Sequence, residues 1–214
     1  MLKALVKTKY DSSANTATAT VIIPVGDVKL KSTCADTTFA PGEGVSLRGV
    51  AFGVEKPGAF MIDYDMHTQA PRFQFMAGAQ IAQKPLKLTY IHAQKRNTTL
   101  LEGSLSLDAR NKVTGAYSFN THKGSLKYTY VHGSGTTLEP SYDFGTEAWH
   151  FTAFKKVSQH DTARCGFDAH HNTVGLEWTR DSKEYGQFKI MATVPTDTSK
   201  TLKLVAEKTW SVDF

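Results

Sequence analysis

Apolar and polar side chains alternate with a period of two along nearly the whole chain. Leu86 and Leu88 alternate with Lys87 and Thr89, and residues 188–194 repeat the pattern. Successive side chains of a β-strand point to opposite faces of the sheet, so this alternation predicts strands with one apolar and one polar face. Many such strands in succession predict an all-β sandwich or barrel.

The alternating segments are separated by short runs with turn chemistry, including Gly26-Asp27, Pro41-Gly42-Glu43-Gly44, Gly133-Ser134-Gly135 and His171-Asn172. Such runs favour consecutive antiparallel hairpins, an up-and-down meander of about 12–16 strands. Pro140 cannot donate a ladder hydrogen bond and therefore weakens the segment that contains it. The candidate strands are residues 2–10, 16–25, 27–36, 46–55, 59–66, 72–80, 86–94, 99–108, 112–120, 124–132, 136–144, 147–155, 162–170, 173–180, 186–194 and 201–211.

Charged residues collect on one parity of these strands and aromatic residues on the other. The apolar parity holds, for example, Leu30, Tyr64, Phe75, Trp149 and Trp178. Lys9 lies on the polar parity. If the polar face points inward, we expect charged residues of this parity to line a pore. The predicted lining is Lys3, Lys7, Lys29, Lys31, Asp63, Asp65, Arg72, Lys87, Glu102, Lys127, Arg164, Asp168, Glu177, Lys189, Lys203 and Glu207.

Periodicity does not tell which face is inside, but geometry favours one answer. A cylinder of roughly 14 strands is too wide for its own side chains to fill. With the apolar face outward, the same cylinder has a lipid-facing belt and a charged, water-filled lumen. Strands of about ten residues also match a tilted bilayer crossing. The alternative is a soluble sandwich or barrel that binds a lipid or another apolar ligand inside.

Composition agrees with one β-domain over residues 1–214. No linker divides the 214 residues, and the mean hydropathy of -0.33 is compatible with strands that are half polar. No apolar run approaches the roughly 20 residues of a spanning helix. If Met1 is the native start, we expect no cleavable leader. Cys34 and Cys165 match no metal or redox spacing, which predicts two reduced thiols on strands.

The sequence carries no motif for catalysis, a cofactor or nucleic acid. The net charge is +5, but the basic residues are scattered and the aromatic residues lie on the opposite parity, which argues against nucleic-acid binding. His170 and His171, near Asp168, resemble metal ligands, yet neighbours on a strand point apart, so a polar turn is the better interpretation. Asp63 and Asp65 share a face without a third acidic residue nearby, which favours a solvated wall over a cation site.

Several longer strings resemble one family, the plastid outer envelope pore proteins of the 24-kDa class. The resemblance covers nearly the whole chain and is weakest over residues 157–172. The strings are Val54–Gly58, Ile62–Asp65, Arg72–Met76, Lys84–His92, Leu126–Gly133, Leu138–Asp143 and Gly175–Arg180.

The resemblance implies a transmembrane β-barrel in the chloroplast outer envelope, and it allows a homo-oligomer. It implies a passive, voltage-responsive, poorly selective channel for triose phosphates, phosphate, dicarboxylates, nucleotides and charged amino acids, without enzymatic activity or cofactor. Membrane lipid and solutes in transit would be its partners. A mixed wall with a modest excess of Lys and Arg agrees with poor ion discrimination. A barrel that acts in import or assembly is a third hypothesis, but it would more often carry an additional soluble domain.

Overall fold

A computed structural model describes residues 3–39, 46–182, 185–196 and 202–213 and contains sixteen strands and two short 3-10 turns. The 3-10 turns are η1 (Asp36–Phe39) and η2 (Gln94–Arg96). The strands are β1 (Lys3–Asp11), β2 (Thr16–Val25), β3 (Val28–Ala35), β4 (Ala51–Lys56), β5 (Phe60–Asp65), β6 (Ala70–Ile81), β7 (Lys84–Ala93), β8 (Thr98–Ser106), β9 (Asn111–Ser118), β10 (Lys123–Val131), β11 (Thr136–Asp143), β12 (Ala148–Lys156), β13 (Asp161–Asp168), β14 (Thr173–Ser182), β15 (Gly186–Pro195) and β16 (Lys203–Asp213).

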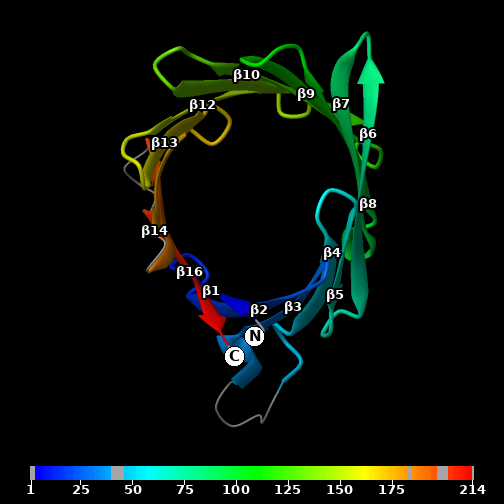
Figure 1. Cartoon of the computed structure of the whole chain (residues 1–214), viewed down its shortest axis with the longest axis vertical. Coiled ribbons are helices and arrows are strands. Elements are labelled where there is room, and N and C mark those ends of the chain that lie inside the picture. The colour runs from blue at the N-terminus through cyan, green and yellow to red at the C-terminus, as the bar shows by residue number, and fades with distance from the viewer. Residues whose placement is uncertain (1–2, 40–45, 183–184, 197–201, 214) are drawn as a thin grey trace.

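Each strand pairs antiparallel with the next one along the chain, and β1 pairs with β16 to close the barrel (Figure 1). The closing pair runs from Lys3 opposite Asp213 to Asp11 opposite Val205. Closure leaves no strand edge unpaired, which is the arrangement that a sheet surrounded by lipid requires. The predicted up-and-down barrel is confirmed, with sixteen strands at the upper end of the predicted range.

The antiparallel order gives the barrel two distinct mouths. The first, which we call the terminal mouth, carries Lys3 of β1, Asp213 of β16 and the turns that precede the odd-numbered strands from β3 onward. The second, the loop mouth, carries the turns that precede the even-numbered strands and the longer segment between β3 and β4. Among the described residues, no helix is long and apolar enough to cross a membrane.

One strand prediction is refined by the structure and another needs correction. Pro140 was expected to weaken its segment, but β11 pairs along its whole length with β12. The missing N–H shows on the β10 side, where the ladder is interrupted between the pairs Lys127–Ser141 and Tyr130–Leu138. A hydrogen bond of 3.1 Å from Thr129 Oγ1 to Glu139 Oε1 joins the two strands inside this gap.

The strand expected over residues 46–55 begins only at Ala51. The preceding residues instead return to η1, where Ser46 N donates to Thr38 O at 2.9 Å and Thr38 Oγ1 donates to Arg48 O at 2.7 Å. Gly49 makes this return with φ +75°. The predicted turn at Pro41–Gly44 and the predicted strand residues 2 and 201 lie outside the described residues.

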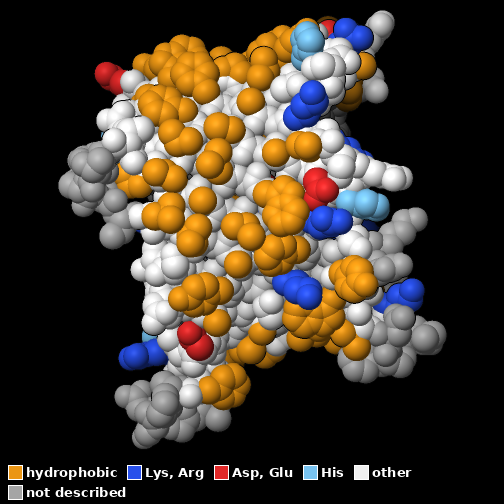
Figure 2. Space-filling model, turned by 90° about the vertical axis from the view of Figure 1, so that its left-hand side faces the viewer, with side chains coloured by type: hydrophobic (Ala, Val, Ile, Leu, Met, Phe, Trp, Pro, Cys, Tyr) orange, Lys and Arg blue, Asp and Glu red, His pale blue; other side chains and the backbone are white. Residues whose placement is uncertain are grey.

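Large apolar side chains are exposed on the outside of the barrel rather than gathered in a core. Figure 2 shows hydrophobic side chains over most of one side of the outer surface. Among the described residues, Ala4 and Ala148 are the apolar residues that are buried, whereas Phe52, Trp149 and Leu176 are each 50% exposed. A water-soluble β-domain of this size would bury large apolar side chains. The exposed band is instead typical of a barrel that lipid surrounds.

Candidate functional site: the inner wall

The strand register places all residues of the predicted lining on one face of the sheet. Directly opposed residues in an antiparallel pair share a face, so the face can be followed from strand to strand. Lys189 lies opposite Glu207, for example, and Glu207 lies opposite Lys9 on β1. Asp63 lies opposite Arg72 in the same way. The alternate face carries the exposed large apolar side chains of the described strands, with Leu5, which shares the face of Lys7, as the exception.

Contacts that skip a strand show that this polar face is the concave, inner one. Arg164 Nη2 on β13 lies 3.5 Å from Glu139 Oε2 on β11, across β12. Lys31 Nζ on β3 lies 3.5 Å from Met61 Sδ on β5, across β4. Side chains of second-neighbour strands converge on the inside of a curved sheet and diverge on its outside. We refer to this face as the inner wall.

Ion pairs between opposite charges occupy the middle of several strands on the inner wall. Lys7 pairs with Glu207 at 2.8 Å, Lys189 with Glu177 at 3.0 Å and Arg72 with Asp63 at 3.3 Å. Lys31 pairs with Glu55, and Arg164 with Glu139. Partly exposed pairs of this kind contribute about 0–1 kcal/mol each to stability. Their larger effect is to interleave both signs of charge, so no single sign dominates the middle of the wall.

The wall of β8–β12 is richer in hydroxyl groups. A groove of about 230 Å³ lies here, lined among others by Thr114, Ser125 and Ser141. Its charged members are Glu102, Lys127 and Asp143. Neither Lys127 nor Glu102 has an ion-pair partner within the described part of the chain. These side chains can offer hydrogen-bond donors and acceptors to many polar solutes, and their described arrangement does not favour one solute over another.

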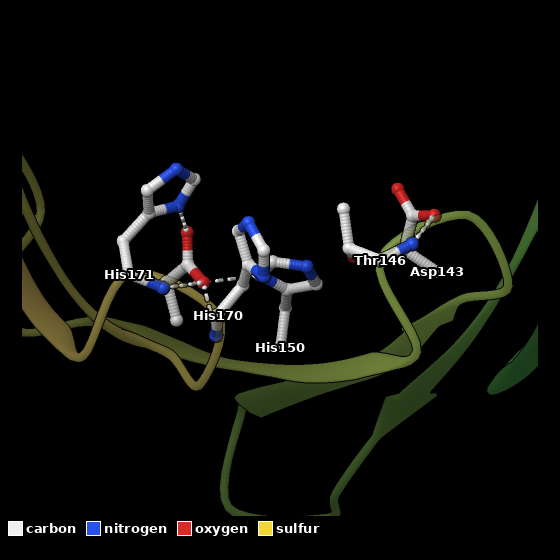
Figure 3. A network of polar contacts seen from close by, with 6 residues as sticks. Asp143, Thr146, His150, His170 and His171 are labelled. Carbon is white, nitrogen blue, oxygen red and sulfur yellow. Dashed lines mark hydrogen bonds and ion pairs between the residues drawn. The ribbon is translucent and has the colours of Figure 1, made fainter.

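His150, His170 and His171 lie together at the loop mouth (Figure 3), around the carboxylate of Asp168. Asp168 Oδ2 lies 2.8 Å from His171 Nδ1, and Asp168 Oδ1 lies 3.3 Å from His150 Nδ1. The same carboxylate accepts the backbone N–H groups of His170 at 2.8 Å and His171 at 3.1 Å. Asp168 therefore ends β13 and shapes the following turn, and the predicted polar turn at His170 and His171 is confirmed.

Asp63 and Asp65 point the same way but act separately. Asp63 pairs with Arg72, whereas Asp65 Oδ1 accepts the backbone N–H of Thr68 at 2.8 Å in the next turn. Cys34 and Cys165 are free thiols on β3 and β13, as predicted, and the register places both on the outer face.

Sequence reasoning left out Glu55, Glu139 and His150, although each lies on the inner wall and contacts a member of the predicted lining. Glu55 is the last residue of its predicted strand, and Glu139 precedes the proline that made its strand look doubtful. The parity rule alone finds both once β4 and β11 are accepted as strands. The contact between Glu139 and Arg164 has no sequence signal, because it depends on the curvature of the wall.

A closed barrel with an apolar outer band and a charged inner wall defines a class: the transmembrane β-barrels of the porin type. The model of one family, Outer envelope pore protein 24, matches residues 2–213. The chain belongs to this family, whose members are channels of the plastid outer envelope.

Relatives of the chain match over its full length. "Outer envelope pore protein 24B, chloroplastic" of Arabidopsis thaliana is 38% identical over 214 residues, covering 100% of this chain and 99% of the relative. "Outer envelope pore protein 24, chloroplastic" of Oryza sativa subsp. indica is 35% identical over 226 residues, with 100% of both chains covered. These relatives agree with the predicted location in the chloroplast outer envelope.

Solved structures of bacterial barrels show the same fold at low identity. A triple mutant of the Rhodopseudomonas blastica porin superposes with a TM-score of 0.57 at 8% identity, covering 99% of this chain and 98% of the porin. The Acinetobacter baumannii outer membrane protein Omp33 gives a TM-score of 0.55 at 13% identity, covering 99% of this chain and 97% of that protein. The likeness concerns the barrel architecture.

Proposed function

We propose that the barrel is a passive, voltage-responsive and weakly selective channel for small polar metabolites. Its solutes would be triose phosphates, inorganic phosphate, dicarboxylates, nucleotides and charged amino acids. The observation that carries the proposal is the interleaving of both charge signs on the inner wall, with Lys7–Glu207 and Lys189–Glu177 as examples. A wall of mixed sign attracts neither cations nor anions strongly, so diffusion through it is broad.

In this proposal a single chain, residues 1–214, forms one complete pore, and the residues of the predicted lining face the solutes. The alternating apolar outer face faces lipid and allows copies of the barrel to associate side by side. Enzymatic chemistry has no role in the proposal.

A flux assay tests the breadth of selectivity. The full chain is refolded into phosphatidylcholine vesicles that are loaded with labelled phosphate, malate, a triose phosphate, ATP or a large dextran. We expect the four small solutes to leave at rates within about one order of magnitude of one another, because a wide pore discriminates poorly between them. Dextran should stay inside, and protein-free vesicles should retain every solute. Release of a single solute, or of none, would overturn the proposal.

A charge-reversal variant tests the lining. Replacing Lys29, Lys31 and Lys87 with Glu should move the reversal potential in a salt gradient toward cation preference. Lys84→Glu is the matched control, because Lys84 begins the same strand as Lys87 but shares the outer face with Ile81. An unchanged reversal potential in the triple variant would count against these lysines facing the pore.

A further inference from the structure

Charged side chains on the outer face of the barrel lie close to strand ends, with one exception. Among the strand residues that the structure describes, the outward-facing charges near a strand end are Lys56, Lys84, Lys155, Asp161 and Arg180. The exception is Lys208, which is the sixth residue of the eleven in β16. Its register partners are Phe188 on β15 and Thr8 on β1, and both lie on the outer face.

A lysine at this height faces the hydrocarbon region, where an outward-facing cation destabilises a barrel. Lys208 is exposed and has no ion-pair partner in the described part of the chain. Its ammonium lies 5.9 Å from the centre of the Trp210 ring, which is the next outward residue toward the terminal mouth. The side chain therefore extends toward that mouth, as snorkelling lysines do.

An apolar groove begins at the same lysine and is formed on the other side by β1, β2 and β3. Its volume is about 430 Å³, and Tyr10, Ala17, Ala19, Cys34 and Ala206 line it together with Lys208. Four of these five side chains are small, so the outer surface is indented here between larger neighbours such as Phe188. Phe188 borders the groove on the β15 side, and Asp36 and Phe39 of η1 close it at the loop mouth. Tyr10 and Ala17 lie at the strand ends that form the loop mouth.

We propose that this groove binds one anionic phospholipid from the leaflet at the terminal mouth. The lipid phosphate pairs with the Lys208 ammonium, and one acyl chain extends from it along the groove toward the loop mouth. Charge complementarity favours this occupant. On the outer faces of the strands the groove offers a chain mainly apolar contacts, and its acidic residue Asp36 lies at the far, loop-mouth end. Lys9 and Glu207 also border the groove, but the register places both on the inner face. Lys208 is therefore the one outward-facing cation of the described lining, and it offers a phosphate the pairing that no described side chain supplies.

Native mass spectrometry of the full chain tests the proposal. The protein is refolded in detergent micelles with equal amounts of phosphatidylglycerol and phosphatidylcholine, and the lipid that remains bound to each chain is counted as detergent is removed. We expect one phosphatidylglycerol per chain, retained about fivefold over phosphatidylcholine, as one lysine–headgroup contact predicts. Lys208→Gln should abolish this preference, and Lys208→Arg should keep it.

Lys155→Gln is the matched control, because it removes an outward cation near a strand end and far from the groove. It should leave the preference intact. Equal retention of the two lipids by the native chain would overturn the proposal. So would an equal loss of the preference for phosphatidylglycerol in the Lys155→Gln and Lys208→Gln variants. A dimer in pure phosphatidylcholine that Lys208→Gln separates would also overturn it, because a second copy would then occupy the groove. Refolding of each variant is checked separately by the heat-dependent gel mobility of the barrel.

Discussion

Replacing Lys189 with Glu tests how the inner wall sets ion preference. The Lys189 ammonium lies 3.0 Å from the Glu177 carboxylate, and Lys189 lies directly opposite Glu207 in the register. Lys189→Glu changes the fixed charge by two units and leaves three carboxylates as neighbours. The variant should therefore turn a balanced section of the wall into a cation-attracting one.

The magnitude follows from Coulomb's law. In so wide a barrel, an ion in water lies roughly 10 Å from the wall. Its interaction energy with one unit charge on the wall is then about 0.4 kcal/mol. Screening at 0.1 M salt reduces this to about 0.15 kcal/mol. Two charge units, acting with opposite sign on cations and anions, give about 0.6 kcal/mol, or a cation-to-anion permeability ratio raised about 2.7-fold.

The assay is the reversal potential of the refolded channel in a planar bilayer under a KCl gradient. The effect should disappear near 1 M salt, where the Debye length is about 3 Å. Lys155→Glu makes the same charge change on the outer face and should leave the ratio unchanged. Lys189→Gln should give about half the free-energy change and serves if the first variant refolds poorly. An unchanged ratio at low salt in a folded Lys189 variant would refute the reasoning.

Three further perturbations test the faces and turns of the barrel. Leu101→Arg places a charge on the lipid-facing side of β8 and should lower the free energy of unfolding by about 2–4 kcal/mol in denaturant titrations in vesicles. Glu102→Arg changes the next residue, which faces inward, and should lower the free energy of unfolding far less. Gly186→Ala should prevent refolding as judged by gel mobility, because Gly186 has φ +72° and an added Cβ would lie 2.0 Å from Thr209 O. Hydrogen bonds from the side chain and backbone of Asn111 and from the backbone of Arg110 lower the pKa of Asp108 in the β8–β9 turn. The carboxylate therefore stabilises the fold above the unfolded-state pKa of about 3.9 and loses this effect as the pH falls through its lower folded-state pKa. Asp108→Ala should destabilise the barrel at pH 7, and the difference from the native chain should shrink steadily as the pH falls below about 3.9.

The sequence predicted the faces of the strands better than their ends. Alternation is a property of each strand by itself, so the side of Lys189 or Trp178 follows from its neighbours alone. The start of β4 depends instead on the hydrogen bonds between Thr38 and the 46–50 segment, which a local pattern does not contain. Pro140 interrupts the ladder to β10, as predicted, but the strand persists because its ladder to β12 is complete.

Only some of the ion pairs of the inner wall could be predicted from the sequence. Pairs between adjacent strands, such as Lys7–Glu207, follow once the register is known. The Arg164–Glu139 pair skips a strand and depends on how strongly the sheet curves. The alternation is the same whether the apolar face points outward or inward, so the sequence favoured the outward arrangement only through the predicted number of strands. The closed ring of sixteen strands confirms that number at the upper end of its predicted range.

Thiol modification during single-channel recording tests the central claim, that the polar face lines a water-filled pore. In a chain whose native Cys34 and Cys165 are replaced by Ala, Thr152→Cys places a thiol on the inner wall, and Ala153→Cys places one on the outer face. A charged, membrane-impermeant thiol reagent should change the current of the Thr152 variant and leave that of the Ala153 variant unchanged. Large current steps that respond equally in both variants, or only in the Ala153 variant, would contradict the account.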